Sequence, residues 1–281
     1  MKIWILNHYA ANMYFDKLGR HQSIANYLIK EGHEVKIFCS NILHNSDKCI
    51  QLEKKLSITK KGDGEVPYVF VKTSSYDENG LNRIKNMISF MTNVKKVIRH
   101  YINIEGKPDV FIASSVHPLT LVAGIQLSRK YKIPCICEMR DLWPEVFVAS
   151  GKLKRNGIFA RLLYRGEKWT YLKADHLIYT MPGGYDYIED RGLNGIIPKS
   201  KVSYINNGVD LYAFDNNIKL FKVEDKQLSE QNVFKVIYVG SIRYINHLED
   251  IVNVAKNLRD RGVNDIKFFI YGEGPDRQRL I

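Results

Sequence analysis

The sequence predicts an α/β protein built from parallel β-sheet, and two features of the chain indicate this class. Short apolar runs alternate with longer segments in which apolar residues recur at helical spacing. Two of the apolar runs lead directly into clusters of polar residues, which is typical of parallel strands whose carboxyl ends line a ligand site. The alternation lapses after residue 210 and restarts at residue 234, so we expect two doubly wound domains, the second of them short.

The elements of the first domain follow in order along residues 1–210. Its strands are expected at Lys2–Leu6, Glu34–Cys39, Val66–Val71, Asp109–Ala113, Ile133–Cys137, His176–Thr180 and Val202–Ile205. Its helices are expected at Gln22–Glu31, Leu81–Tyr101, Leu119–Tyr131, Ile158–Leu172 and Tyr185–Arg191. The polar segment Asn41–Gly64 has no clear period, and we expect a variable excursion there.

The second domain is expected over residues 234–281, after a charged and irregular linker at 211–233. Its elements are a strand at Phe234–Val239, a helix at Leu248–Arg261 and a strand at Ile266–Tyr271. Two strands and one helix do not bury both faces of a sheet. We therefore expect residues 234–281 to be the incomplete beginning of a domain.

Composition is ordinary for a globular protein, and the use of cysteine leads us to expect a reduced, cytoplasmic setting. Hydrophobic residues make up 45% of its 281 residues and charged residues 26%. No apolar run approaches the ~20 residues that span a bilayer, and the start, MKIWILNHYA, is typical of a first strand rather than a signal peptide. The four cysteines show no metal-ligand spacing, so we expect reduced thiols and no metal site.

The formal net charge of +12 predicts an anionic partner. Seven basic residues against one acidic residue lie between Lys152 and Lys173, and six against one lie between Arg83 and Lys107. Both segments also carry apolar residues at helical spacing, so each is either an amphipathic helix on an anionic bilayer or a packed helix with a solvated basic face. Nucleic acid is not expected as the partner, because the sequence lacks a recognition helix, a zinc pattern and an RNP-like aromatic strand.

Polar side chains follow two strands of the first domain. One strand runs into Ser114-Ser115-Val116-His117-Pro118, and the next into Glu138-Met139-Arg140-Asp141-Leu142-Trp143-Pro144. Because the carboxyl ends of parallel strands lie at one edge of a sheet, we expect both clusters to contribute to one site.

Several motifs together resemble the retaining glycosyltransferases of family 4, which have the GT-B fold of two facing Rossmann-like domains. The motifs that carry the resemblance are Arg20 with Gly32-His33-Glu34-Val35, Ser114-Ser115-x-His117-Pro118-Leu119, Glu138-x-Arg140-Asp141-Leu142-Trp143-Pro144-Glu145, Asn207-Gly208-Val209-Asp210, Val239-Gly240-Ser241 and Gly272-x-Gly274. The tryptophan after the Asp is most similar to bacterial enzymes of O-antigen and capsular polysaccharide synthesis. The resemblance covers nearly all of residues 1–214 and is thinner beyond them.

The resemblance implies transfer of a sugar from a nucleotide-diphosphate donor, without a cofactor or metal, to a glycan acceptor that is expected to be lipid-linked. It implies catalytic roles for His117, Arg140 and Asp141. It further implies substrate contacts by Gly19, Arg20, Glu138, Trp143, Asn207 and Gly208, and donor contacts by Gly240, Ser241, Arg243, Gly272 and Gly274. The family's second cation in the donor loop, a lysine, has no counterpart here, and no Glu-x7-Glu motif follows before Ile281.

Alternatives remain open at several of these positions. His117 is otherwise a loop histidine satisfied by backbone, Glu138 to Asp141 an internal network that stiffens the loop, and Gly19 a plain turn residue. Trp143 is as readily a packing wedge as a platform for sugar. For the chain as a whole, the alternative to an active transferase is an inactive fragment of one that binds acceptor or membrane.

Overall fold

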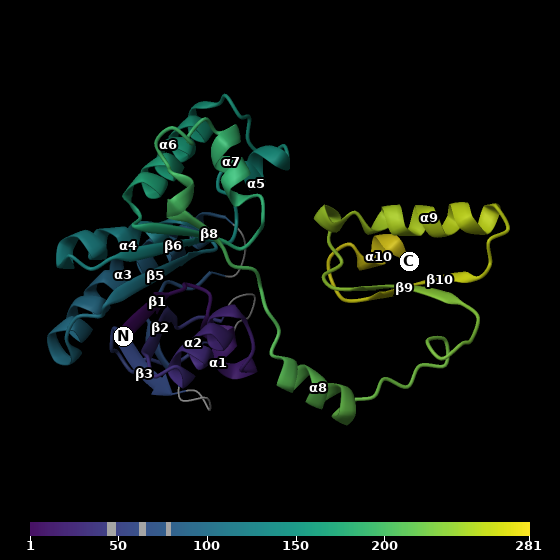
Figure 1. The fold of residues 1–281 in the computed structure, drawn as a ribbon, viewed down its shortest axis with the longest axis horizontal. Coiled ribbons are helices and arrows are strands. Elements are labelled where there is room, and N and C mark those ends of the chain that lie inside the picture. Colours follow the sequence, from purple (N-terminus) through teal and green to yellow (C-terminus); the bar gives the residue numbers. More distant parts are fainter. Residues whose placement is uncertain (44–48, 62–65, 77–79) are drawn as a thin grey trace. The chain divides into compact units, whose positions relative to one another are not determined.

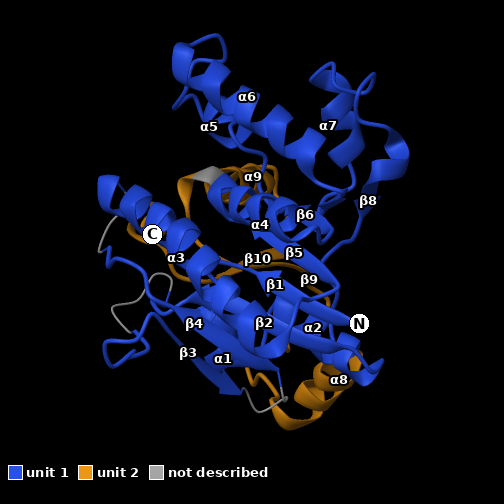
Figure 2. Ribbon diagram, turned by 90° about the vertical axis from the view of Figure 1, so that its left-hand side faces the viewer, with its two compact units in different colours: residues 1–210 blue, residues 211–281 orange. Residues whose placement is uncertain are grey.

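A computed structural model describes residues 1–43, 49–61, 66–76 and 80–281. The chain divides into two compact units, Met1–Asp210 and Leu211–Ile281 (Figure 2). Within the described ranges, no helix is long and apolar enough to cross a membrane.

Unit 1 is built on one sheet, which among the described residues has eight strands in the order β3-β4-β2-β1-β5-β6-β7-β8. The strands are β1 (Lys2–Leu6), β2 (Glu34–Ser40), β3 (Ser57–Lys61), β4 (Pro67–Val71), β5 (Val110–Ser115), β6 (Cys135–Met139), β7 (His176–Tyr179) and β8 (Val202–Tyr204). Every pairing is parallel except that of the edge strand β3 with β4. The direction of winding reverses at β1, which lies between β2 and β5, and ligands bind at such a reversal in open α/β sheets.

Helices cover both faces of this sheet (Figure 1). They are α1 (Ala11–Asp16), α2 (Arg20–Lys30), α3 (Leu81–Glu105), α4 (Pro118–Tyr131), α5 (Glu145–Ala149), α6 (Ile158–Lys173) and α7 (Gly184–Asp190). Alternate residues of a strand point to opposite faces, so the sheet has two cores. Trp4 of β1 packs in the core shared with α3, α4 and α6, whereas Ile5 packs in the core shared with α1 and α2.

The predicted α/β class is confirmed, and the predicted strands of unit 1 recur within two residues at either end. Two short α-helices and one strand of unit 1 were missed. Helices α1 and α5 have six and five residues, too few to display a helical period. Strand β3 lies in the segment predicted to be a variable excursion, where its pairing with β4 is not written in the local sequence. Residues 44–48 and 62–64 of that segment lie outside the described residues.

Unit 2 contains the parallel pair β9 (Phe234–Val239) and β10 (Ile266–Tyr271), as predicted, with α9 (Leu248–Asp260) between them and α10 (Arg277–Leu280) after them. The expectation of an irregular linker over 211–233 was wrong for its first part, because Leu211–Leu220 forms helix α8. This helix forms because Leu211, Phe214 and Ile218 are apolar and lie three and four positions apart. The charged stretch after Leu220 obscured that spacing in the sequence.

Candidate active site

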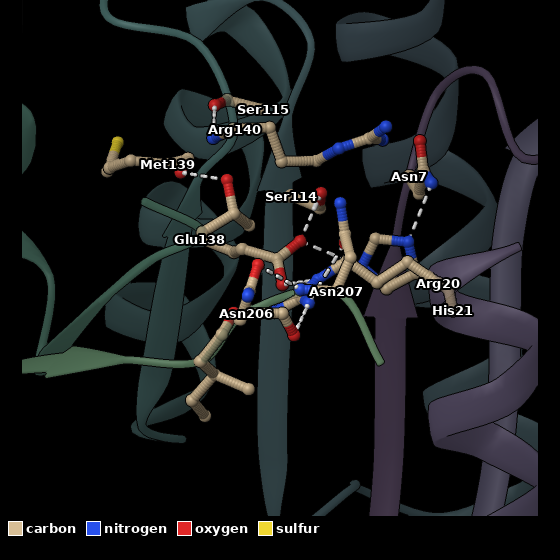
Figure 3. Close-up of polar contacts among 12 residues, drawn as sticks. Asn7, Arg20, His21, Ser114, Ser115, Glu138, Met139, Arg140, Asn206 and Asn207 are labelled. Atoms are coloured by element: carbon tan, nitrogen blue, oxygen red, sulfur yellow. Dashed lines mark hydrogen bonds and ion pairs between the residues drawn. The ribbon is translucent and has the colours of Figure 1, made fainter. Parts of the chain in front are cut away.

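The candidate site lies at the carboxyl edge of the unit 1 sheet, where β1 adjoins β5 and β5 adjoins β6. Asn7 and His8 follow β1, Ser114 and Ser115 end β5, and Glu138 lies near the end of β6. Most of these side chains take part in the polar contacts drawn in Figure 3. Two groups of residues at this edge differ in how completely they are paired.

The first group centres on the buried carboxylate of Glu138. Its Oε1 accepts a hydrogen bond of 2.7 Å from Arg20 Nε. Its Oε2 accepts from His21 Nε2 at 2.9 Å and from Ser114 Oγ at 2.7 Å. We call Arg20, His21, Ser114 and Glu138 the Glu138 network. Both carboxylate oxygens are therefore occupied from within the chain.

Hydrogen bonds fix the protonation of this network. Asn7 Nδ2 lies 2.8 Å from His21 Nδ1, and Asn7 Oδ1 accepts from the Tyr9 backbone, so Nδ1 of His21 is the acceptor and its Nε2 carries the proton. Burial raises the pKa of Glu138, but the hydrogen bonds from His21 and Ser114 and the charge of Arg20 outweigh it and lower the pKa to about 2. The carboxylate is thus ionised at neutral pH.

Arg20 also ties the start of α2 to the segment after β8. Its Nη1 donates to the Asn206 carbonyl at 2.7 Å and to Asn207 Oδ1 at 3.2 Å, and its Nη2 donates to the Ile205 carbonyl at 2.8 Å. The preceding Gly19 has φ +118°, a conformation that favours glycine, and a Cβ there would lie 3.0 Å from the Met13 side chain. Arg20 therefore binds both Asn207 and Glu138 in this structure, although all three residues were predicted to contact substrate.

The second group begins with a buried histidine pair. His8 Nδ1 lies 2.6 Å from His117 Nε2, although the two residues are 109 positions apart. The His8 ring stacks on Phe90, with ring centroids 4.3 Å apart and planes 4° from parallel, and on Tyr9 at the same distance. His8 is thereby held in a fixed plane and meets the His117 ring edge-on at 88°.

His117 is fully buried at the N-terminal end of α4, where Pro118 begins the helix. Burial, assisted by the charge of Arg83, lowers the pKa of His117 to about 3, so the imidazole is neutral at physiological pH. Its Nδ1 is buried and has no hydrogen-bond partner among the residues that the structure describes. A buried polar atom without a hydrogen-bond partner lowers the stability of the fold by about 1–3 kcal/mol, which favours a functional reason for its presence.

Arg140 and Asp141 follow β6 directly. The Arg140 backbone N–H donates to Ser115 Oγ at 3.2 Å, which joins the ends of β5 and β6. Its guanidinium extends across the strand ends toward Asn7 (Figure 3) and makes no hydrogen bond to the described part of the chain. Desolvation raises the pKa of the Asp141 carboxyl, and the charge of Arg140 opposes that rise. We call His117, Arg140 and Asp141 the open group.

Trp143 lies beside this edge and packs edge-on against Phe147, with ring centroids 4.6 Å apart. It lines a small pocket together with Ser115, Asp141 and the buried Glu167. Burial raises the pKa of Glu167, although Tyr187, Arg191 and Tyr171 all donate to its carboxylate. Trp143 thus fills space between α5 and the sheet edge and also reaches the pocket that Asp141 borders.

The donor residues predicted in unit 2 lie at the carboxyl edge of β9 and β10. Gly240 and Ser241 follow β9, and Gly272 and Gly274 follow β10. A Cβ on Gly272 would lie 1.8 Å from the Gly240 carbonyl oxygen, and one on Gly274 would lie 2.0 Å from that of Ile242. Close backbone packing between the two loops therefore accounts for these glycines. Arg243 is exposed in the same loop. Gly208, in unit 1, has no atom within 4 Å of the position that a Cβ would take.

Sequence reasoning found His117, Arg140, Asp141 and Glu138 but missed His8, His21 and Asn7. A signal was present for each, since Asn7 and His8 directly follow the first strand and His21 adjoins Arg20. Within the described residues, no cluster of His, Cys, Asp or Glu is arranged to hold a metal ion. The edge offers instead a neutral imidazole, an unbonded guanidinium and a partly desolvated carboxyl, a set suited to binding a polar ligand that carries negative charge.

Comparison with known proteins identifies the family of the chain. The family model for Glycosyltransferase Family 4 matches residues 22–212, more than half of the chain. No curated protein matches the sequence.

Solved structures are similar in fold at low sequence identity. Sucrose-phosphate synthase from Thermosynechococcus elongatus has a TM-score of 0.53 at 13% identity, covering 96% of this chain and 70% of that one. Anabaena HepE in complex with UDP has a TM-score of 0.50 at 14% identity, covering 100% and 71%. The calicheamicin glycosyltransferase CalG4 has a TM-score of 0.50 at 9% identity, covering 97% and 69%. The chain belongs to glycosyltransferase family 4 and has the α/β fold of the GT-B type.

Proposed function

We propose that this protein transfers a sugar, with retention of anomeric configuration, from a nucleotide-diphosphate donor to a lipid-linked glycan. The observation that carries the proposal is the open group in a chain of glycosyltransferase family 4. His117 and Arg140 follow neighbouring parallel strands, and neither the His117 Nδ1 atom nor the Arg140 guanidinium has a hydrogen-bond partner in the described residues. Both groups therefore keep unused hydrogen-bonding capacity at the edge where we propose that the ligand binds.

Each member of the open group has a proposed role. The neutral His117 positions a sugar hydroxyl by a hydrogen bond and does not act as a charged acid, since its pKa is about 3. Arg140 stabilises the negative charge that develops as the donor bond breaks. Removal of one side chain with this role slows a reaction by about 10²–10³-fold. Asp141 accepts a hydrogen bond from the acceptor. Trp143 supplies apolar surface for a sugar ring.

The Glu138 network has a supporting role in this proposal. Its Arg20 bonds Asn207 and keeps the segment after β8 against the start of α2, and Gly19 supplies the positive φ that precedes Arg20. The donor diphosphate is proposed to bind at the unit 2 loops, with Arg243 as its cation and backbone N–H groups of Gly240 and Ser241 nearby. A GT-B neighbour that was solved with UDP supports this choice of donor.

The pathway and location are proposed from sequence motifs. The run from Glu138 to Glu145 resembles enzymes of O-antigen and capsular polysaccharide synthesis, so we propose cell-surface polysaccharide as the product. Unit 1 is proposed as the acceptor domain and unit 2 as part of the donor domain. Acceptors attached to lipid place the reaction at the cytoplasmic face of the plasma membrane.

Release of nucleoside diphosphate tests the proposal. The protein is incubated with a panel of UDP, GDP and dTDP sugars and with lipid-linked glycan extracted from bacteria. We expect release with one donor, dependence on the acceptor, and NMR signals of a product whose anomeric configuration matches the donor. Inversion would contradict the retaining mechanism. A protein that binds the acceptor and releases nothing would contradict transfer and support the acceptor-binding alternative.

A further inference from the structure

The positive charge of this protein is concentrated on one layer of helices. Within the described helices α3, α4 and α6, which pack on the same face of the sheet, there are eleven basic residues and two acidic ones. Both acids are already bonded, Glu105 to Lys36 and Glu167 to Arg191. The two helices on the opposite face, α1 and α2, carry two basic residues and one acidic residue. These three helices therefore carry +9 of the formal net charge of +12.

Large apolar side chains are exposed at one end of this layer. In α6, Ile158 is 84% exposed, Phe159 74% and Leu162 63%. They lie among the basic residues Lys152, Lys154, Arg161 and Arg165, and no acidic residue occurs between 151 and 166. We call residues 152–165 the α6 patch. Its apolar side chains are not the inner face of the helix, because Ala160, Tyr164 and Glu167 are buried against the rest of unit 1.

Helix α3 repeats this arrangement. Leu81, Ile84 and Ile88, at helical spacing, are 77%, 50% and 45% exposed. Farther along the helix, a groove between α3 and α4 is lined by Lys95, Lys96, Arg99 and Lys130. Exposed apolar residues thus occupy the N-terminal halves of both α3 and α6, and basic residues lie beside them or behind them. Isolated exposed apolar residues are ordinary in soluble proteins, whereas clusters of them mark interaction surfaces.

We propose that the α6 patch docks unit 1 on an anionic lipid bilayer. Aliphatic and aromatic side chains gain free energy when they enter the lipid interface, and lysine and arginine gain it beside anionic headgroups. Nucleic acid satisfies the charge equally well, but it offers no apolar phase for Ile158 and Leu162. The combination of both kinds of side chain in one short segment favours the bilayer.

The position of the patch relates docking to the candidate site. A helix that connects two parallel strands runs back along the sheet, so α6 begins at the edge where β6 ends. This is the edge that carries Arg140 and Asp141. A bilayer bound at the α6 patch therefore lies beside the site, where a lipid-linked acceptor would be presented. Only this last consequence rests on the proposed function, because docking itself follows from the surface.

Vesicle co-sedimentation of the full chain tests the proposal. The vesicles are phosphatidylcholine alone or phosphatidylcholine mixed with phosphatidylglycerol. We expect binding to the anionic vesicles that weakens as salt is raised. Each basic residue near such a surface raises the partition coefficient about fivefold. The double variant Arg161→Glu/Arg165→Glu is therefore expected to reduce the partition coefficient by at least about 25-fold. The triple variant Ile158→Ser/Phe159→Ser/Leu162→Ser is expected to reduce it by at least about tenfold at constant charge.

Matched controls come from the opposite edge of the same layer. Ile104 is 61% exposed at the end of α3, and Lys107 is exposed just beyond it. Ile104→Ser and Lys107→Glu are expected to leave binding within about twofold of the parent chain. A tryptophan at position 159 (Phe159→Trp) reports insertion directly, since brominated lipids in the vesicles should quench its added fluorescence.

Three outcomes would overturn the proposal. The first is no binding to anionic vesicles. The second is binding that depends on charge but not on the triple serine variant, which would indicate a general polyanion surface such as one for RNA. The third is equal loss in the control variants. Release of nucleoside diphosphate in detergent, without vesicles, is measured in the same triple variant. If release persists while vesicle binding is lost, docking and transfer are separate properties, so failure of one does not mimic failure of the other.

Discussion

The Glu138 network and the open group lie at the same edge of one sheet but differ in pairing. Every oxygen of Glu138 and every nitrogen of the Arg20 guanidinium has a partner within the chain. In the open group, His117 Nδ1 and the Arg140 guanidinium have none among the described residues. Complete pairing is what a buried charge needs in order to hold a fold together, whereas an unsatisfied group at a strand end is suited to a ligand.

The comparison also separates two kinds of histidine. His21 bridges Asn7 and Glu138 and uses both ring nitrogens. His117 uses one nitrogen on His8 and leaves the other without a partner. Burial alone does not distinguish the two residues, because both are almost completely buried. The number of satisfied ring nitrogens does distinguish them, and on this basis we propose a structural role for His21 and a ligand-binding role for His117.

The largest expected effect follows from breaking the Glu138 network. Glu138→Ala leaves Arg20 buried without its carboxylate, so we expect a loss of about 3–5 kcal/mol in the free energy of unfolding. Urea unfolding measures it. Arg155→Ala is the matched control, because the Arg155 side chain is 57% exposed in its ion pair with Glu145, and its removal should cost less than about 1 kcal/mol. Similar losses in the two variants would show that the network is not the stabilising element.

The next effect is a pH dependence of stability caused by His117. Its pKa is about 3 in the folded chain and 6.5 ordinarily, so the unfolded chain takes up the proton first and stability falls as the pH drops below 6.5. Over the whole interval the loss is about 5 kcal/mol. Glu138, whose pKa is about 2, contributes only below its ordinary value of 4.5, again with loss of stability on acidification.

Unfolding in urea between pH 6.5 and about 5 isolates the histidine. We expect His117→Gln to flatten the slope by up to about 1.4 kcal/mol per pH unit. The exposed His100→Gln is the control and should leave the slope unchanged. A parent slope that is already flat in this interval would mean that His117 is not held neutral by burial.

A smaller effect is expected from His8→Phe. Phenylalanine keeps the stack on Phe90 but removes the hydrogen bond to His117 Nε2. We expect sugar transfer to fall about tenfold and stability by about 1–3 kcal/mol. Nitrogen NMR of the His117 ring should report a changed tautomer or protonation. An unchanged His117 spectrum would rule out a positioning role for His8, whatever happened to stability.

How much of the fold could be predicted from the sequence depends on whether the contacts that form each element are local. Strands such as β1 and β9 appeared at their predicted residues, because a run of apolar residues specifies them without help from elsewhere. Strand β3, Ser57–Lys61, is polar and exists because β4 pairs with it, which local pattern does not encode. Helix α8 was hidden by the charged residues that follow it.

The same distinction applies to the site. The polar clusters after β5 and β6 predicted which residues gather at the edge, because parallel topology brings strand ends together. Sequence did not reveal that Glu138 is bound by Arg20 and His21, more than a hundred residues away. Nor did it reveal that His8 meets His117. Which polar residues are paired and which are open is decided by contacts between distant segments.

Arg140→Ala tests most directly whether the open group serves transfer while the Glu138 network serves the fold. Both nucleoside diphosphate release and urea unfolding are measured on this variant and on Glu138→Ala. We expect Arg140→Ala to unfold within about 0.5 kcal/mol of the parent chain and to release nucleoside diphosphate about 10²–10³-fold more slowly. Full activity in Arg140→Ala, or a loss of stability equal to that of Glu138→Ala, would contradict this division of roles.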